Sequence, residues 1–304
     1  TRHDARTHVK STKGNVRSGI RTHASRGDSK QRRGVRKPVQ RAATDPDHPQ
    51  TPNQVLESAP PGLDLLPLGV GDQKDSCTAE EVEVLTRGQR TNPEWFTWRK
   101  NRITASVAHS IAHCHFVNGR SKFPPTSYLA AVTGRPRPSH TRTRAMSWGV
   151  HMEAETLKSA TLGHPVSVQE CGLFIDARRP WLAASPDGIV MDRQTGQRLL
   201  CLEVKCPYKH RQRRVEDACR APAYRLKKSH SYFTQIQCQL AVTGLRQADL
   251  VVFTLQETAI VPVTFDPELW EETVSKLQVF YRDAVQPHLR EMKRDTGTTW
   301  TPEL

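Results

Sequence analysis

Hydrophobic and polar positions follow two different periods in the chain beyond residue 77. Apolar residues recur at helical spacing after Thr78, where Glu81 completes a capping-box pattern, and again over residues 104–111 and 147–162. Short β-branched runs separated by turn formers come next, and such runs are typical of strands. We expect these strands over residues 166–175, 181–184, 188–191 and 199–205.

A second group of elements completes the chain. Apolar side chains at helical spacing predict a helix through residues 232–240. Two further strands are expected over residues 250–254 and 260–265, before a final helix that begins at Asp266 with Pro267 in its first turn. This order of elements predicts an α/β fold in which a mixed central sheet is flanked by helices.

Residues 1–76 contrast with this pattern, because the first aromatic residue of the chain is Trp95. Residues 1–43 are rich in Arg, Lys, Ser, Gly and His, and residues 44–76 add six prolines. Such segments bury too little apolar surface to offset the entropy of ordering. We therefore expect residues 1–76 to be a disordered basic tail with a Pro-rich linker, and residues 77–304 to form the folded domain.

The formal charge of +14 is concentrated near the N-terminus. Residues 1–43 hold 13 Lys and Arg against two Asp, whereas the other 261 residues hold 32 basic and 29 acidic groups. The cluster over residues 30–37 fits a nuclear-import signal or a weak phosphate-binding arm, and a solvating tail without a specific role fits equally well. Seven scattered Cys without a Cys-x-x-Cys pair are typical of reduced intracellular thiols. No run of 18 apolar residues exists, so we expect no membrane span.

Charged residues interrupt the apolar pattern at two neighbouring predicted strands. Asp187 precedes one strand, and Glu203 and Lys205 lie on the next. Strand alternation puts Glu203 and Lys205 on one face, with Val204 pointing into the core. The turn at residues 192–196 folds the strands into a hairpin, which brings Asp187 beside Glu203. Two carboxylates so close repel unless a cation lies between them, and oxygen ligands, including a carbonyl such as that of Val204, suit Mg²⁺.

Such a site has the chemistry needed to hydrolyse a phosphodiester. A divalent metal lowers the pKa of a water and stabilises charge on a phosphate oxygen. Lys205 would orient the attacking water or neutralise the developing charge, and burial beside a metal is expected to lower its pKa. The Glu-x-Lys pattern alone arises on the order of once per chain by chance, and an exposed strand edge is its plain alternative. The apolar run over residues 199–206 favours a site, because unpaired charges are costly there.

Five ordered blocks between about residues 87 and 265 resemble the lambda-type exonuclease, or YqaJ-like viral recombinase, branch of the PD-(D/E)xK nucleases. These blocks are residues 95–106, 148–153, 185–188, 202–207 and 232–237. The resemblance implies a restriction-endonuclease-like core that degrades DNA with Mg²⁺, for which Mn²⁺ would substitute, as a 5′-to-3′ exonuclease on duplex ends. The alternatives are a structure-specific endonuclease and a non-catalytic nucleic-acid-binding protein. The resemblance also implies a homotrimer and a single-strand annealing protein as candidate partners.

The resemblance further implies a role for each matched residue. Asp187 and Glu203 would ligate the metal, Lys205 would be the catalytic lysine, and Gln235 would hold the nucleophile or the lysine. Glu153 would be a further acidic ligand or a group that positions water. The residues implied to bind a terminal 5′ phosphate are Arg99, Ser106 and Ser185, with Arg102 as an alternative to Arg99.

Several of these residues, and some others, have plainer interpretations. Glu153 would otherwise be an exposed helix charge, and Gln235 an ordinary polar helix residue, as Gln237 and Gln239 would be. His109, His113, Cys114 and His115 suggest zinc, but no second ligand pair accompanies them, so a helix face or loop is favoured. Two basic segments, residues 135–144 and 209–214, fit either contacts to a DNA backbone or solvated loops, and the second follows the lysine motif directly.

Overall fold

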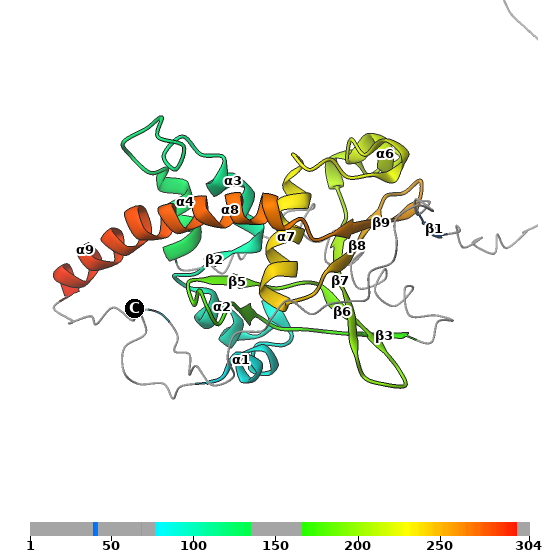
Figure 1. The fold of residues 1–304 in the computed structure, drawn as a ribbon, viewed down its shortest axis with the longest axis horizontal. Helices are drawn as coiled ribbons and strands as arrows, with labels where there is room; N and C mark the ends of the chain where they lie inside the picture. The colour runs from blue at the N-terminus through cyan, green and yellow to red at the C-terminus, as the bar shows by residue number, and fades with distance from the viewer. Residues whose placement is uncertain (1–38, 42–67, 69–76, 135–165, 297–304) are drawn as a thin grey trace, which may run out of the picture. The chain divides into compact units, whose positions relative to one another are not determined.

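A mixed six-stranded sheet is the largest element of the fold (Figure 1). The computed structural model describes residues 39–41, 68, 77–134 and 166–296. The strand order of this sheet is β1-β9-β8-β7-β6-β3; β7 with β8 and β1 with β9 pair in parallel, and the other neighbours are antiparallel. Its strands are β1 (Val39–Arg41), β3 (Val166–Gln169), β6 (Gly188–Asp192), β7 (Arg198–Lys205), β8 (Gln247–Phe253) and β9 (Thr258–Thr264). A second sheet has the order β2-β5-β4 and consists of β2 (Ile103–Thr104), β5 (Leu182–Ala184) and β4 (Phe174–Ile175).

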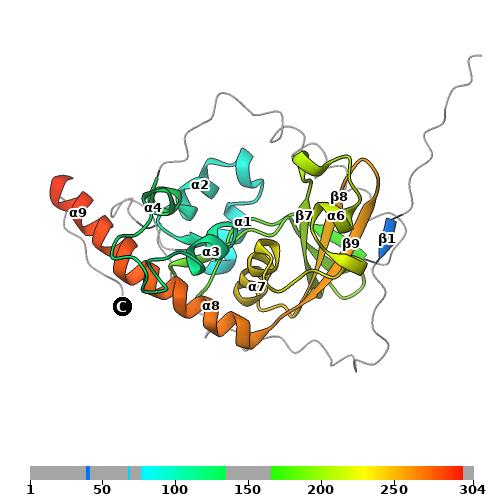
Figure 2. The same cartoon turned by 90° about the horizontal axis from the view of Figure 1, so that it is seen from above.

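Helices connect the two sheets and pack against them (Figures 1 and 2). The helices before β3 are α1 (Ala79–Leu85), η1 (Gln89–Thr91), α2 (Pro93–Arg99), α3 (Ala105–Ala112) and α4 (Thr126–Thr133). Those after β7 are η2 (Tyr208–His210), α6 (Val215–Ala218), η3 (Pro222–Tyr224), α7 (Ser231–Thr243), α8 (Pro267–Phe280), η4 (Tyr281–Val285) and α9 (Gln286–Thr296). Because β7 and β8 are parallel neighbours, α7 is the crossover that connects them. The prediction of a mixed α/β fold with a central sheet flanked by helices is confirmed.

Capping residues begin the helices where the sequence predicted them. Thr78 and Glu81 form both bonds of the capping box of α1, with Thr78 N to Glu81 Oε2 at 2.7 Å. Thr104 precedes α3, and Asp266 caps α8 by accepting a bond from Leu269 N at 3.1 Å, with Pro267 in the first turn. Helix α2, which the sequence analysis did not predict, has the same kind of start, an Asn cap followed by proline.

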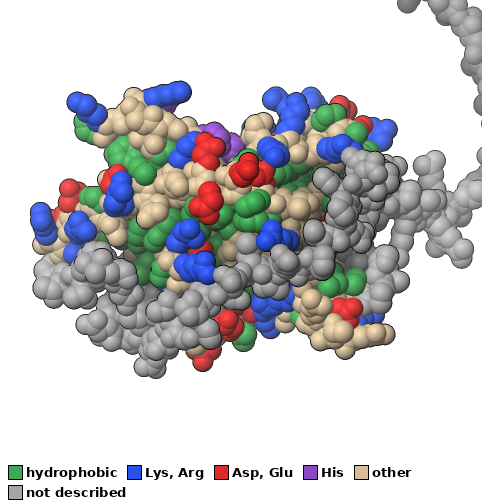
Figure 3. Space-filling view, viewed as in Figure 1, with side chains coloured by type: hydrophobic (Ala, Val, Ile, Leu, Met, Phe, Trp, Pro, Cys, Tyr) green, Lys and Arg blue, Asp and Glu red, His purple; other side chains and the backbone are tan. Residues whose placement is uncertain are grey.

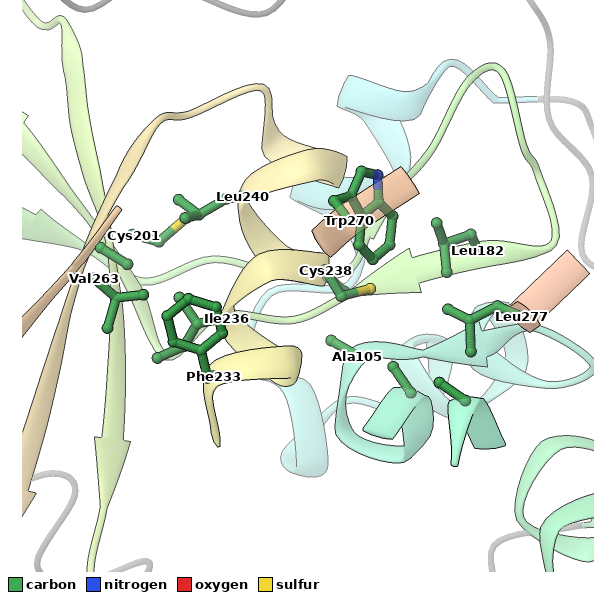
Figure 4. Packing of buried hydrophobic residues seen from close by; sticks show 14 of the residues in the cluster. Ala105, Leu182, Cys201, Phe233, Ile236, Cys238, Leu240, Val263, Trp270 and Leu277 are labelled. Atoms are coloured by element: carbon green, nitrogen blue, oxygen red, sulfur yellow. The ribbon is translucent and has the colours of Figure 1, made fainter. Parts of the chain in front are cut away.

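Helix α7 lies at the centre of the hydrophobic core and is buried on more than one side. In Figure 4, Ile236 and Leu240 point toward the six-stranded sheet, near Val263, whereas Cys238 points toward Trp270 of α8. Ile236, Cys238 and Leu240 are each 0% exposed. A helix that is apolar on several faces belongs in an interior, so its polar residues need partners there.

The predicted strand over residues 166–175 is wrong in its extent, because it is two strands in different sheets. Between β3 and β4 the chain passes close to α1, where Gly172 N donates to Glu83 Oε1 at 2.9 Å and Leu173 N to Thr86 Oγ1 at 2.7 Å. These side-chain acceptors replace the ladder bonds of a continuous strand. A Cβ at Gly172 would overlap the Glu83 carbonyl oxygen, so the close approach requires glycine there.

Other sequence-based expectations fall partly outside these residues. Val39–Arg41 forms β1 within the range expected to be disordered. The rest of residues 1–67, the helix predicted over 147–162 and the basic segment 135–144 lie outside the described residues. In the part of the chain that the structure covers, no helix is long and apolar enough to cross a membrane.

Candidate active site

The hairpin of β6 and β7 places Asp187 against the strand that carries Glu203. The antiparallel register pairs Gly188 with Leu202, so Asp187, one residue before β6, lies beside Glu203. Asp187 N donates to Leu202 O at 3.0 Å, and Asp187 Oδ2 accepts from Val204 N at 2.6 Å. The turn at residues 192–196 closes this hairpin as predicted, with Gly196 in the left-handed region at φ 70°. The expected proximity of Asp187 and Glu203 is therefore present.

Glu203 is a buried carboxylate, 3% exposed, whose two oxygens both accept hydrogen bonds. Oε1 accepts from Lys205 Nζ at 2.6 Å and from Gln235 Nε2 at 2.8 Å. Oε2 accepts from Gln239 Nε2 at 2.7 Å. A buried charge is tolerated only when it is paired and hydrogen-bonded, and this carboxylate is both.

Lys205 completes a closed ring of contacts with Glu203 and Gln235. Its ammonium donates to Gln235 Oε1 at 2.9 Å and lies 5.0 Å from the centre of the Tyr232 ring. Burial by itself lowers the pKa of Lys205, but the charge of Glu203, its hydrogen bond and the charge of Asp187 outweigh burial and raise the pKa above its ordinary value. This direction is opposite to the one expected from the sequence. Lys205 is therefore a protonated donor at neutral pH.

Successive side chains of β7 point to opposite faces of the sheet, as predicted. Glu203 and Lys205 both face α7, as their bonds to Gln235 show. Val204 faces the opposite side, where it packs in a small buried cluster with Leu202 and Val251. The charged pair thus lies on the side of the sheet that α7 covers.

The oxygen donors at this position fit a hard divalent cation. Asp187 and Glu203 bring two carboxylates from neighbouring strands, the ligand type that Mg²⁺ prefers while it keeps several waters. Among the residues that the structure describes, no three His, Cys, Asp or Glu side chains are grouped as metal ligands. Glu153, expected as a further acidic ligand, lies outside those residues.

A second cluster, built on α2 and the end of β5, contains two of the predicted phosphate-binding residues. Arg99 stacks on the Trp95 ring at 3.9 Å, and Trp95 Nε1 donates to Ser185 Oγ at 2.8 Å. Arg99 Nε is buried and has no hydrogen-bond partner among the described residues. Burial, followed by the nearby charge of Arg90, lowers the pKa of Arg99 to about 10. We call the cluster of Arg99, Trp95 and Ser185 the Arg99 corner. It is joined to the hairpin of the candidate site because Ser185 lies two residues before Asp187 in the chain.

The other two predicted phosphate contacts differ from each other. Ser106 is exposed in the first turn of α3, and its hydroxyl lies 3.1 Å from that of Thr104. Arg102 is 1% exposed and donates to the backbone carbonyls of Pro180 at 2.8 Å and Trp98 at 2.7 Å. The Arg102 guanidinium thus holds the backbone together inside the fold, a position that favours Arg99 over Arg102 as the proposed phosphate contact.

Gln239 is a site residue that the sequence analysis did not single out. It is 0% exposed, and its side-chain amide donates to Glu203 Oε2; its own Oε1 has no partner among the described residues. Gln237 has another role, since its amide binds Thr264 O and Asp266 N and ties α7 to the start of α8. The available signal was spacing: Gln235 and Gln239 are four residues apart and so share a helix face.

The histidine group on α3 resembles a helix surface more than a metal site. His109 Nδ1 is 2.8 Å from Thr234 Oγ1, and the rings of His109 and His113 lie 4.1 Å apart. Thr234 lies on α7, so this contact joins α3 to α7.

Comparison with known proteins gives matches in sequence pattern and in fold. The YqaJ-like viral recombinase domain matches residues 94–246, half of the chain. An alkaline exonuclease, LHK-Exo, from Laribacter hongkongensis is 21% identical, with a TM-score of 0.50, over 67% of this chain and 97% of that one. Its complex with dAMP gives a TM-score of 0.51 at the same identity and coverage, and these likenesses establish a shared fold. No curated protein sequence matches the chain. With half its length matched, this chain belongs to the YqaJ-like viral recombinase family.

Proposed function

We propose that this protein is a metal-dependent deoxyribonuclease that works as a 5′-to-3′ exonuclease on duplex ends. The observation that carries the proposal is the closed ring of Glu203, Lys205 and Gln235 beside Asp187. A buried acid and lysine on one strand, with a second acid next to them, form the minimum set for hydrolysing a phosphodiester. Membership of the recombinase family and the fold shared with an alkaline exonuclease support the same conclusion.

The side chains divide the chemistry between them. Asp187 and Glu203 would hold Mg²⁺, or Mn²⁺ in its place, and the ion when bound would supply Lewis acidity at the scissile phosphate. Lys205, protonated and fixed by Glu203 and Gln235, would donate a hydrogen bond to the attacking water or to the developing charge on phosphorus. Gln235 would keep the lysine in place, because its amide contacts both partners.

The Arg99 corner supplies the argument for action at an end. Arg99 has a buried nitrogen for which the described residues offer no acceptor, and Ser185 and the Trp95 indole lie next to it. An arginine fork and a hydroxyl suit a terminal phosphate, because together they give several charge-assisted donors. An end phosphate held at this corner would fix the distance to the bond that is cut.

The first experiment replaces Lys205 by Ala and follows an end-labelled linear duplex with Mg²⁺ and with chelator. We expect the cleavage rate to fall by about 100-fold to 1,000-fold or more, while DNA binding in chelator is largely kept. Lys276→Ala is the matched control, since Lys276 is also partly buried and ion-paired, at 2.9 Å to Glu272, but lies on α8. An unchanged rate in Lys205→Ala would rule out the proposed mechanism.

Exonuclease action and its direction need a second substrate comparison. Linear duplex should be degraded while covalently closed circular duplex of the same sequence survives. A 5′ label should be released before a 3′ label on the same linear molecule. Cutting of the closed circle would instead indicate an endonuclease.

A further inference from the structure

One segment holds the excess positive charge of the folded part of the chain. Residues 207–230, which we call the basic strap, connect β7 to α7 and contain eight Lys and Arg against two Asp and Glu. The surrounding ranges 77–134, 166–206 and 231–296 contain eighteen Lys and Arg against eighteen Asp and Glu. The strap therefore adds a local positive charge to a fold whose other described residues hold equal numbers of basic and acidic side chains.

Most of these cations are directed to solvent. Figure 3 shows Lys and Arg side chains gathered over the region of α6, which is part of the strap. The exposed ones are Lys209, Arg213, Arg214, Arg220, Arg225, Lys227 and Lys228. Arg214 and Lys228 pair with Glu257 and Asp266, the latter at 2.6 Å. Like charges held together at a surface without equal numbers of acids are a preformed site for a polyanion.

Buried contacts fix the strap in place despite its charge. Glu257, in the turn between β8 and β9, accepts from Val215 N at 2.7 Å and from the Tyr224 hydroxyl at 2.9 Å. Val215 and Cys219 are 0% and 2% exposed and belong to the main core. The same β8–β9 turn donates from Leu255 N to Arg211 O. Contacts to the β8–β9 turn and to the core thus hold the strap in place, and its exposed cations form one group.

The backbone of the strap is also strained. Arg220, Ala223 and Tyr224 have φ angles of 50°, 53° and 54°, in the left-handed region that non-glycine residues seldom adopt. Such conformations persist only where surrounding contacts hold them, and they concentrate at sites that bind ligands. Here Glu257 holds Tyr224 directly, so the strain and the anchor occur together.

The strap begins and ends at the candidate active site. Its first residue follows Lys205 by two positions, and its last, His230, caps α7 by accepting from Tyr232 N at 3.0 Å. Helix α7 then carries Gln235 into contact with Lys205. A strand of nucleic acid whose phosphate lies at Lys205 would therefore pass next to the cations of the strap.

We propose that the basic strap binds the phosphate backbone of DNA next to the bond that is cut, independently of base sequence. This inference rests on the proposed nuclease function and adds the surface that holds its substrate. The recognised chemistry is a row of phosphates, because the exposed groups are cations without an arrangement for reading base edges. Preformed cations would hold the duplex without an ordering cost in the protein.

The test measures binding of a fluorescent 5′-phosphorylated duplex to the full chain in chelator, over a series of salt concentrations. The variant is Arg213→Gln with Arg220→Gln and Arg225→Gln. We expect the slope of log affinity against log salt to fall by about two to three, and affinity at low salt to fall about tenfold or more. The control, Arg282→Gln with Arg290→Gln and Arg294→Gln, removes three exposed charges from η4 and α9 and should change affinity less than about twofold.

Two results would overturn the inference about the strap. One is a strap variant with the salt slope and affinity of the unmodified protein. The other is an equal loss in the control, which would mean that only total charge matters. Failure of the proposed function is separately visible, because Lys205→Ala reports on cleavage whereas this experiment is done where no cleavage occurs.

Discussion

The carboxylate side and the arginine side of the candidate site are built in opposite ways. Around Glu203, three donors satisfy both oxygens, and the lysine that neutralises the charge is one of them. At the Arg99 corner, a half-buried guanidinium is stacked on Trp95, and its buried Nε has no partner among the described residues. The carboxylate is thus held by donors of the protein itself, whereas the arginine is held by ring stacking and has a buried donor to offer to an anion.

This difference fits the roles proposed for the two regions. A satisfied carboxylate keeps its orientation before substrate arrives, which is the preorganisation that an electrostatic site needs. A buried donor without an acceptor raises the free energy of the unbound state, and a phosphate would remove that cost on binding. The carboxylate side is therefore suited to chemistry, and the arginine side to recognising an end.

On the carboxylate side, the largest effect is expected from removing the Gln239 amide that binds Glu203. Gln239→Leu roughly keeps side-chain volume but removes the donor to Glu203 Oε2 that the described part of the chain supplies. We expect metal affinity or activity to fall about 10-fold to 100-fold, as when groups that orient a metal ligand are lost. The measurements are the half-saturating Mg²⁺ concentration for cleavage and the thermal shift caused by Mn²⁺ alone.

Gln237→Leu is the control for that experiment. Gln237 is equally buried, but its amide serves the backbone at Thr264 and Asp266 and not Glu203. It should lower the melting temperature without shifting the half-saturating Mg²⁺ concentration. The same Mg²⁺ shift in both variants would mean that Gln239 acts only through stability.

Arg99→Ala tests the arginine side. If Arg99 reads the terminal phosphate, the variant should lose the preference for 5′-phosphorylated over 5′-hydroxyl ends, a change of about tenfold in relative kcat/KM. Arg90→Ala, which removes an exposed neighbouring charge, should retain the preference. Equal losses on both kinds of end would contradict the assignment.

A smaller effect is expected from raising the pH, which should weaken the preference for 5′-phosphorylated ends. Burial lowers the pKa of Arg99 to about 10, so the charged form that binds phosphate is depleted as pH rises through that value. We expect the ratio of kcat/KM on phosphorylated and hydroxyl ends to decline about twofold between about pH 8 and pH 10, since kcat/KM reports the free enzyme. In Arg99→Ala the ratio should be flat over this range, and a flat ratio in the unmodified protein would contradict the prediction.

Local patterns along the chain were enough to predict much of the fold. The capping residues Thr78 and Asp266, the hairpin turn at residues 192–196 and the strand carrying Glu203 and Lys205 are all consequences of short-range rules. The proximity of Asp187 to Glu203 followed from the hairpin alone. Such features need no knowledge of which segments meet across the fold.

The remaining features depend on distant contacts. The break between β3 and β4 is caused by Glu83 and Thr86, which are 89 and 87 residues away from their partners. Arg102 and Arg99 look alike in sequence, and only the positions of Pro180 and Trp98 show that Arg102 is internal. Gln239 likewise gains its role only because α7 covers β7.

The parallel pairing of β7 and β8 has a consequence for how the centre forms as the chain is made. A ribosome that has released residue 205 has provided Asp187, Glu203 and Lys205, but neither amide that holds Glu203. Those amides come with α7, which belongs to the crossover that the parallel pairing of β7 and β8 requires. Until that crossover closes, the acid on β7 has one partner on its own strand, so a nascent chain cannot carry a finished catalytic centre.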